Sequence, residues 1–259
     1  MNNLRMNNLK LKRYDLFFIM CGLMFFTSCN IKKSDSETAG GCSFASTGLT
    51  EATNYGTFDP NGAWQCSQYT SGTTIWSGMV SNVGVDFAPV AVPASLFGSG
   101  AACGQCYSVQ GASSTIVARV IGECSGCTGR LDMDEVSFTK VTGIAPGFGV
   151  GSVTVTAIPC PVSGNVKIRT DLGSNPYYQK IAVADHVTPI QSVQIDIGSG
   201  FQSLTRAGTT SDFEGSLGAS ASTTAIVKVT DIFNQTVQGS YATAASSTTT
   251  IGAQFGTCQ

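Results

Sequence analysis

Short hydrophobic runs recur along most of the chain, and none of them keeps the spacing of a helix for long. The runs are rich in β-branched residues, or they alternate between apolar and polar positions as a strand with one buried face does. The clearest of them cover residues 115–121, 152–158, 190–197 and 225–229. Thirty glycines and many serines and threonines separate the runs as turn residues do. The pattern predicts a predominantly β protein.

One segment has the pattern of a helix instead. It runs from Asp134 to about Thr142, carries acidic residues in its first turn and is followed by Gly143. Acidic side chains are favoured at the N-terminal end of a helix, and glycine commonly ends one. The apolar positions of the segment are ordinary packing positions, so we expect this helix to be structural.

The hydrophobic run at residues 16–26 differs from the others because it follows basic residues at positions 10–13. This order is typical of a signal peptide, and the run is too short for a membrane span. Small residues then precede Cys29, as in a bacterial lipoprotein cleavage site. We therefore predict a lipoprotein-type signal peptide over residues 1–29, with Cys29 lipidated; the alternative is an ordinary signal peptide cut nearby. Either form predicts export, to the bacterial cell envelope or surface as a lipoprotein, or by secretion.

The chain after the predicted signal divides into three parts. Residues 30–41 are polar and end in two glycines, which predicts a flexible tether. A cysteine-rich half then gives way, at Cys160 and Pro161, to a half with a single cysteine. We predict domains over residues 42–160 and 161–259, which dock against each other because no long linker separates them.

The charge of the chain excludes one class of partner. The sequence has 14 Lys and Arg against 16 Asp and Glu, for a net charge of −2, and it has no basic cluster in the part that follows the signal. Proteins that bind nucleic acid need such a cluster, so we expect no nucleic acid partner. A thinly charged surface suits a neutral ligand better.

Eight cysteines follow the tether, and their even number in an exported chain predicts a disulfide framework. They are Cys42, Cys66, Cys103, Cys106, Cys124, Cys127, Cys160 and Cys258. The alternative is a zinc ribbon, because two Cys-x-x-Cys pairs lie seventeen residues apart. Export and the glycine-rich β context favour disulfides, so we expect no metal and no cofactor. The sequence leaves the pairing of the cysteines open.

A series of short motifs runs through both halves. The series is Ala52-Thr53-Asn54-Tyr55-Gly56, Ala101-Ala102-Cys103-Gly104-Gln105-Cys106, Val120-Ile121-Gly122-Glu123-Cys124-Ser125-Gly126-Cys127, Leu131-Asp132-Met133-Asp134, Cys160-Pro161-Val162-Ser163-Gly164-Asn165, Gly173-Ser174-Asn175-Pro176-Tyr177-Tyr178 and Ala184-Asp185-His186. In this order and spacing it resembles the expansins, and within them the microbial expansin-like proteins, from about Thr50 to about Val237.

The resemblance implies an all-β fold with two domains. The first would be a six-stranded double-psi β-barrel related to glycoside hydrolase family 45. The second would be an immunoglobulin-like β-sandwich of carbohydrate-binding module family 63. Expansins loosen cell-wall polysaccharide networks without hydrolysis. The expected partner is thus cellulose, a xyloglucan-type matrix glycan or peptidoglycan. We expect the protein to be a monomer and to contact a membrane only through its lipid anchor.

The resemblance also implies a wall-loosening site on the first domain. Its central aspartate falls on Asp132, and its threonine falls on Thr53. Tyr55 replaces a smaller polar group and offers a ring for stacking on a sugar. Read from its position alone, Asp132 would be a carboxylate that accepts hydrogen bonds from backbone amides at a helix N-terminus, as Asp134 would.

Hydrolysis of a glycosidic bond needs a second carboxylate on the other side of the bond. The hydrolase's base would fall at Gly56 and Thr57, and Asp59 lies out of register, so we expect no hydrolysis. Many relatives also have an aspartate where this chain has Gly122. The side chain of the adjacent Glu123 would point to the opposite face of a strand.

The sugar-binding surface of the second domain is expected at Tyr177 and Tyr178, since sugars stack their apolar faces on aromatic rings. Consecutive strand residues face opposite ways, so both rings can face a ligand only on an irregular backbone, which Pro176 favours. The alternative puts one ring in the core. Relatives have a third aromatic further on, which residues 205–210 lack, so we expect weaker binding to crystalline cellulose, or another glycan.

Two further functions remain open. One is an enzyme, either a lytic transglycosylase resembling rare lipoprotein A or an endoglucanase-like barrel. The other is a purely glycan-binding surface protein with the barrel as a scaffold, which Gly122 favours. The second half of the chain argues against the transglycosylase. We expect His186 to be structural, and Trp64 and Trp76 to lie in the core or to line a groove.

Overall fold

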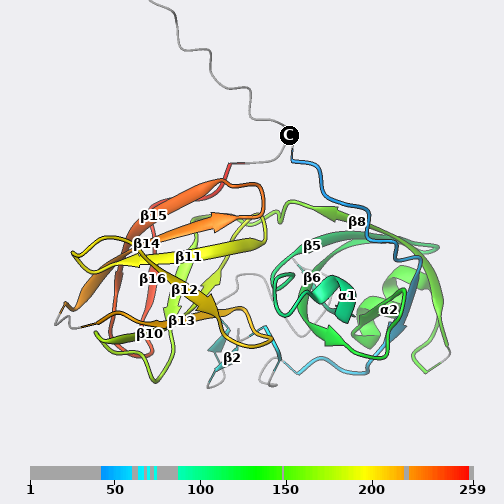
Figure 1. The fold of residues 1–259 in the computed structure, drawn as a ribbon. Helices are drawn as coiled ribbons and strands as arrows, with labels where there is room; N and C mark the ends of the chain where they lie inside the picture. Colours follow the sequence, from blue (N-terminus) through cyan, green and yellow to red (C-terminus); the bar gives the residue numbers. More distant parts are fainter. Residues whose placement is uncertain are drawn as a thin grey trace, which may run out of the picture. The chain divides into compact units, whose positions relative to one another are not determined.

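The structure is a computed structural model, and it describes residues 42–59, 64–66, 69–70, 73–74, 87–147, 149–218 and 222–256. The predicted signal peptide and tether lie outside these residues, as do Trp76 and Cys258. The described residues form sixteen strands and two short helices (Figure 1). They belong to one compact unit, Ala39–Gln259. None of their helices has the length and apolar character that crossing a membrane requires.

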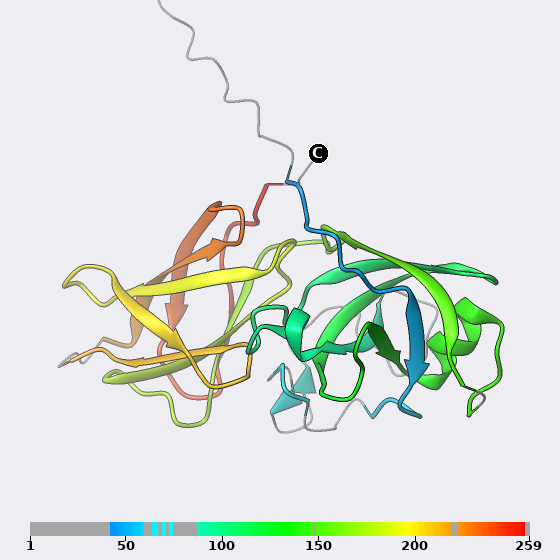
Figure 2. The same cartoon turned by 45° about the vertical axis from the view of Figure 1, so that its right-hand side comes forward.

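Six strands of the first half form a closed barrel in the order β1, β7, β4, β6, β5, β8. Their bounds are β1 Glu51–Asn54, β4 Ala88–Pro93, β5 Cys106–Gly111, β6 Thr115–Cys124, β7 Arg130–Met133 and β8 Gly151–Ile158. β1 pairs with β7 and β4 with β6 in parallel, whereas the other neighbours are antiparallel. Figure 2 shows the blue strand β1 from a second direction. This is the predicted six-stranded double-psi barrel. A separate two-stranded sheet pairs β2 Tyr69–Thr70 with β3 Thr73–Thr74.

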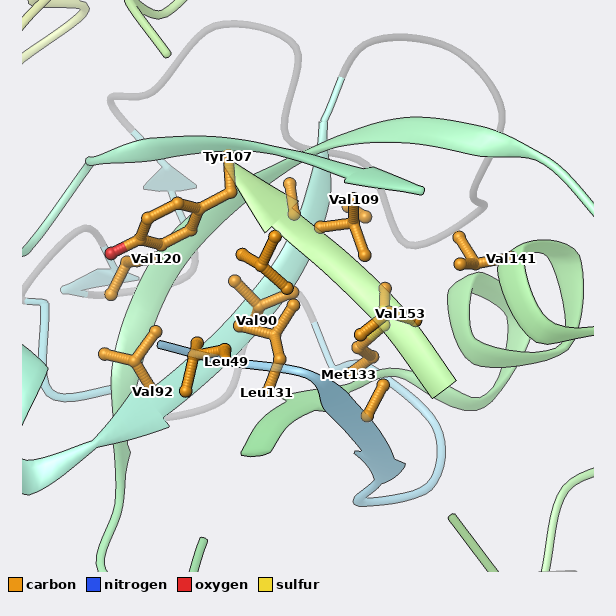
Figure 3. Packing of buried hydrophobic residues seen from close by; sticks show 14 of the residues in the cluster. Leu49, Val90, Val92, Tyr107, Val109, Val120, Leu131, Met133, Val141 and Val153 are labelled. Atoms are coloured by element: carbon orange, nitrogen blue, oxygen red, sulfur yellow. The ribbon is translucent and has the colours of Figure 1, made fainter. Parts of the chain in front are cut away.

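The barrel is filled by alternate side chains of its strands. Along β8 the exposure alternates, so that Val153 and Val155 are buried while their neighbours are exposed. Figure 3 shows side chains of this cluster, among them Val90, Val109 and Leu131, gathered between the strands. Because alternate residues face inward, the residues between them face the outside of the barrel.

Helix α2, Glu135–Thr142, packs Phe138 and Val141 against the barrel. The Asp134 carboxylate caps it by accepting hydrogen bonds from the backbone N–H groups of Val136 and Ser137, each at 3.1 Å. Gly143 ends it in the left-handed conformation, with φ at 73°. The sequence prediction of this helix is confirmed. The short helix α1, Ala94–Phe97, had no sequence signal.

The second half forms eight antiparallel strands that fold into the predicted immunoglobulin-like sandwich. Their bounds are β9 Lys167–Thr170, β10 Tyr178–Ala184, β11 Ile190–Asp196, β12 Gln202–Arg206, β13 Asp212–Ser216, β14 Thr224–Asp231, β15 Thr236–Ala242 and β16 Thr248–Thr250. The strand order is β15, β14, β11, β12, β13, β10, β9, β16, and one core collects side chains from both halves of that order. The sheet folds tightly enough that a Cβ on Gly239 would lie 2.7 Å from Ile251 Cβ. Glycine is needed there for this close approach.

Three disulfides join described cysteines, which confirms the predicted framework. They are Cys66–Cys103, Cys106–Cys160 and Cys124–Cys127, and Cys42 is also disulfide-bonded. Cys103 and Cys106 thus belong to different bonds. The four cysteines of the two Cys-x-x-Cys pairs therefore do not form the alternative zinc ribbon.

Barrel and sandwich residues share a buried contact. Phe58, Phe87 and Ile121 of the first half form one hydrophobic cluster with Ala182 and Ala184 of β10. The buried Arg119 places its guanidinium 3.8 Å from the centre of the Phe87 ring. Arg206 of β12 donates to the backbone oxygen of Gly100 at 3.1 Å. These contacts make the two folds one packed unit.

His186 belongs to this buried region, as its expected structural role requires. It is almost fully buried. Burial, followed by the charge of Arg119, lowers the pKa of its imidazole to about 3. The neutral form is therefore the one that packs.

Candidate functional site

The centre of the candidate site on the barrel is Asp132 on β7. Leu131 and Met133 on either side of it point into the core, so Asp132 faces outward. The parallel pairing of β1 with β7 sets Thr53 opposite Asp132. The Thr53 hydroxyl donates to Asp132 Oδ1 at 2.7 Å. The sequence motifs placed these two residues 79 positions apart, and the structure brings them together.

The Asp132 carboxyl group is half-buried, and this affects its proton. Desolvation raises its pKa above the ordinary range of aspartate, and the hydrogen bond from Thr53 partly offsets the rise. Asp132 lies on β7, whereas Asp134 caps the helix. The alternative role of Asp132 as a helix-terminal carboxylate is thus not the one the structure gives it.

The outward face beside Asp132 is lined by small residues. Ala91 of β4 stands opposite Asp132 on one side and opposite Gly122 of β6 on the other. Cross-strand partners project to the same face, so an aspartate in place of Gly122 would stand two strands away from Asp132. A Cβ on Gly122 would lie 3.2 Å from Gln65 Oε1. This oxygen accepts a hydrogen bond from the backbone N–H of Glu123. Gln65 supplies a polar group that no sequence motif indicated.

Aromatic rings lie next to this face. The ring of Tyr55, just beyond the end of β1, has its centre 5.5 Å from that of Trp64. The Tyr55 hydroxyl donates to the Pro89 carbonyl at 3.3 Å, and the indole N–H of Trp64 donates to the Asp59 carbonyl at 2.9 Å. Trp64 is half-buried and packs against the hydrophobic cluster that barrel and sandwich residues share.

A second carboxylate, that of Glu135, lies beside Thr57, where the sequence has no acidic residue of its own. Thr57 occupies the position of the hydrolase base, and its hydroxyl donates to Glu135 Oε1 at 2.8 Å. Glu135 begins helix α2, three residues after Asp132. The sequence around Thr53 gives no sign of this carboxylate, because it comes from a segment 78 residues away.

The sandwich presents its two predicted tyrosines from a turn. Asn175 Oδ1 accepts hydrogen bonds from the backbone N–H groups of Tyr177 at 2.9 Å and Tyr178 at 3.2 Å. Tyr177 precedes β10 and is 56% exposed, whereas Tyr178 starts the strand and is partly exposed. The backbone is thus irregular here, as both rings need in order to reach a ligand, and neither ring lies in the core. Leu172, 71% exposed, lies in the segment between β9 and β10 as well.

Polar groups surround the Tyr178 ring. Its hydroxyl donates to Glu214 Oε2 at 2.6 Å, and this bond raises the pKa of the phenol. Lys180 lies opposite Glu214 and pairs with Asp171 at 3.1 Å. Phe213 is buried in the core of the sandwich. The predicted sugar-binding surface thus has two rings beside hydrogen-bonding side chains, and residues 205–210 contain no aromatic residue.

Part of the chain is similar in sequence to expansins and expansin-like proteins. The chain is 28% identical over 113 residues to expansin-like protein 5 of Dictyostelium discoideum, covering 41% of this chain and 47% of the relative. It is 31% identical over 108 residues to expansin-B11 of Oryza sativa subsp. japonica, covering 34% of this chain and 36% of the relative. The matches thus span less than half of the length of these relatives. No protein-family profile matches the chain.

Solved structures show the same fold. The crystal structure of the apo expansin of Clavibacter michiganensis superposes with a TM-score of 0.65 at 22% identity. A mutant of that expansin in complex with cellohexaose superposes with a TM-score of 0.64 at 21% identity. Each covers 81% of this chain and 98% of the other.

The fold defines a β protein in which a closed six-stranded double-psi barrel precedes a large antiparallel sandwich. Proteins with this architecture and with matching sequence segments are the expansins. The resemblance predicted from the motifs is confirmed: the chain is similar to expansins and expansin-like proteins, and it has the expansin fold.

Proposed function

We propose that this protein binds cell-wall polysaccharide of the cellulose type and loosens it without hydrolysis. The observation that carries the proposal is the half-buried Asp132 carboxyl group, held by the Thr53 hydroxyl on the outward face of an expansin-type barrel. The complex of the similar Clavibacter expansin with cellohexaose supports a β-linked glucan as the ligand.

Burial raises the pKa of Asp132, so this carboxyl group holds its proton up to a higher pH than an exposed aspartate does. A carboxyl group that keeps its proton can donate a hydrogen bond to a sugar hydroxyl or a glycosidic oxygen, and its other oxygen can accept one. Such bonds replace those between neighbouring glycan chains. This exchange separates the chains and breaks no covalent bond.

The two tyrosines supply the grip. An exposed ring stacks on the apolar face of a sugar, and several such contacts on one chain add up to stable attachment. Attachment through Tyr177 and Tyr178 would hold the polysaccharide while Asp132 acts on it. With two rings and no third, we propose weaker binding to crystalline cellulose than a three-ring surface gives.

A three-part measurement tests this function. Cellulose, plant cell wall and peptidoglycan are each incubated with the protein, and pull-down, mechanical weakening and released sugar are recorded. Asp132→Asn should abolish weakening and leave pull-down unchanged, whereas Tyr177→Ala/Tyr178→Ala should reduce both. Glu51→Gln is the matched control, because Glu51 is the carboxylate two residues before Thr53 and pairs with Arg130 at 2.8 Å. Weakening that survives Asp132→Asn would refute the role of Asp132.

The second candidate function is hydrolysis or lytic cleavage, and one observation favours it. Glu135, bonded to Thr57, provides a second carboxylate close in sequence to Asp132. Glycosidases use two carboxyl groups on opposite sides of the bond. Abundant soluble sugar from any of the three glycans, lost in both Asp132→Asn and Glu135→Gln, would establish this enzyme in place of the loosening protein. Binding without weakening or product would leave a purely glycan-binding protein.

We further propose that the chain is exported and lipid-anchored. Basic residues, an apolar run and small residues before Cys29 support this, and the polar residues 30–41 would carry the folded part away from the membrane. In this proposal the protein acts as a monomer with no nucleic acid partner. Cys29→Ser should release the protein from membranes. Protein found free in both forms would favour plain secretion.

A further inference from the structure

The Cys124–Cys127 disulfide lies directly beside the Asp132 carboxyl group. The two Sγ atoms and a carboxylate oxygen of Asp132 all lie within 4.8 Å of one another. Cys124 and Asp132 are half-buried, and Cys127 is 8% exposed. Among the described residues, this is the one group of three or more potential ligands of this kind.

The connection between β6 and β7 brings the three residues together. Cys124 is the last residue of β6, and the Cys127 N–H donates to the Cys124 carbonyl at 3.2 Å. The Arg130 N–H donates to the Cys127 carbonyl at 3.1 Å. Arg130 is the first residue of β7, the strand that carries Asp132. Both strands also pair with β4. Backbone bonds therefore hold the three side chains near one another whether or not the sulfur atoms are joined.

This disulfide is also the one most open to reduction among the three with described partners. Ser125 and Gly126 between its cysteines are exposed. The cysteines of the bonds Cys66–Cys103 and Cys106–Cys160 are all buried. A reductant in solution reaches an exposed turn before it reaches a packed core.

We propose that reduction of Cys124–Cys127 converts this corner of the barrel into a zinc-binding site with Asp132 as the third ligand. A dithiol donates two electrons and two protons, so that the S–S bond becomes two thiols and the dithiol becomes a disulfide. Zn²⁺ then binds both sulfurs as thiolates and releases the two protons. Asp132 provides a carboxylate oxygen, and water completes the four ligands.

The ligand set fits zinc in type and in spacing. Thiolates favour Zn²⁺ over Mg²⁺ and Ca²⁺, which prefer oxygen. Two cysteines separated by two residues are a common zinc-binding pair. Zinc bonds of about 2.3 Å to sulfur and about 2 Å to oxygen need ligand atoms roughly 3.5–4 Å apart. The cluster is already compact enough to reach that arrangement with small movements once the S–S bond has opened.

The bound metal would change what Asp132 can do. Its carboxylate would be held by the cation as the ionised form, and it could no longer donate a proton to a glycan. The reduced, zinc-bound protein would thus be a second state of the barrel. The metal site itself does not depend on whether the protein binds a glycan, so each proposal is tested without the other.

Cobalt binding to the full chain tests the site, because thiolate-bound Co²⁺ has a charge-transfer absorption band. The protein is reduced with a dithiol until two thiols are free. Alkylation of one sample identifies these thiols, and the rest of the reduced protein is titrated with Co²⁺. We expect one Co²⁺ per reduced chain, displaced by Zn²⁺, and none in the oxidised protein. Asp132→Asn should weaken binding by more than roughly a hundredfold, the upper end of what the loss of a supporting residue costs. Glu123→Gln is the matched control and should bind as the wild type does.

Three results would overturn the proposal. One is a reduced protein with free thiols at Cys124 and Cys127 and no thiolate–cobalt band. Another is affinity unchanged by Asp132→Asn. The third is binding that persists in Cys124→Ser/Cys127→Ser, which would assign the metal to other cysteines. If that variant does not fold, alkylation of the same two thiols in the reduced wild type replaces it and must abolish the band.

Discussion

The barrel and the sandwich present their candidate functional residues in different ways. In the barrel, Asp132 and Thr53 are neighbours because two strands pair in a fixed register, and Asp132 stands between two core residues of its own strand. In the sandwich, Tyr177 stands on a turn whose shape depends on the Asn175 side chain. Side chains on a regular sheet are held more precisely than side chains on a turn, so we expect the barrel face to suit directed hydrogen bonds and the turn to suit ring stacking.

The strongest test of this difference is removal of the barrel disulfide Cys66–Cys103. It closes a loop with a sequence separation of 37, so Cys66→Ser/Cys103→Ser should lower the free energy of unfolding by about 4 kcal/mol. Cys124→Ser/Cys127→Ser, with a separation of 3, should cost about 2 kcal/mol. Urea unfolding followed by tryptophan fluorescence measures both, because both tryptophans precede residue 160. Equal losses would show that the long loop is held by its packing and not by the bond.

A smaller effect is expected from the turn of the sandwich. Asn175→Ala removes the acceptor of two backbone N–H groups and should lower the stability by about 1 kcal/mol. Tyr177 and Tyr178 would lose their fixed relation, so binding to cellulose should weaken by roughly tenfold, or about 1.4 kcal/mol. Thr53→Val is the control on the barrel and should leave this binding unchanged. Pull-down isotherms on cellulose measure both variants, and wild-type affinity in Asn175→Ala would show that the turn does not position the rings.

The sequence predicted the parts of the site that are local along the chain. The helix, its acidic cap and Gly143 follow from spacing, and the motifs gave both domain folds. Which residues pair across neighbouring strands could not be predicted from these local patterns. Gln65, Glu135 and the closeness of the Cys124–Cys127 bond to Asp132 all depend on which segments meet in space. Each of these residues had an ordinary local context, and the closure of the barrel brought them to the site.

For the two tyrosines, the residues could be predicted from the sequence, but the contacts that hold them could be predicted only in part. The sequence identified Tyr177 and Tyr178 and the condition for both to face a ligand, namely an irregular backbone. It named Pro176 as the cause. In the structure the Asn175 carboxamide also holds the turn, by accepting from both tyrosine N–H groups. Side-chain hydrogen bonds to the backbone of this kind shape turns, as the fixed φ of proline does.

The smallest expected effect is a shift in pH dependence at Asp132. Burial raises the pKa of this carboxyl group in the folded protein. The protonated group therefore contributes to the stability of the fold below the pKa of the unfolded chain, and this contribution is lost as the pH rises through the pKa of the folded protein. If loosening uses the protonated form, it should increase as the pH falls. Thr53→Val removes the bond that lowers the pKa, so its profile should move to higher pH.

The matched control for this shift is Thr57→Val, which removes a threonine bond to Glu135 in place of one to Asp132. It should leave the pH profile of wall weakening where the wild type has it. A profile that moves equally in both variants would mean that general loosening of the barrel face controls the pH dependence. A shift confined to Thr53→Val would assign the titration to the carboxyl group that the barrel register places beside it.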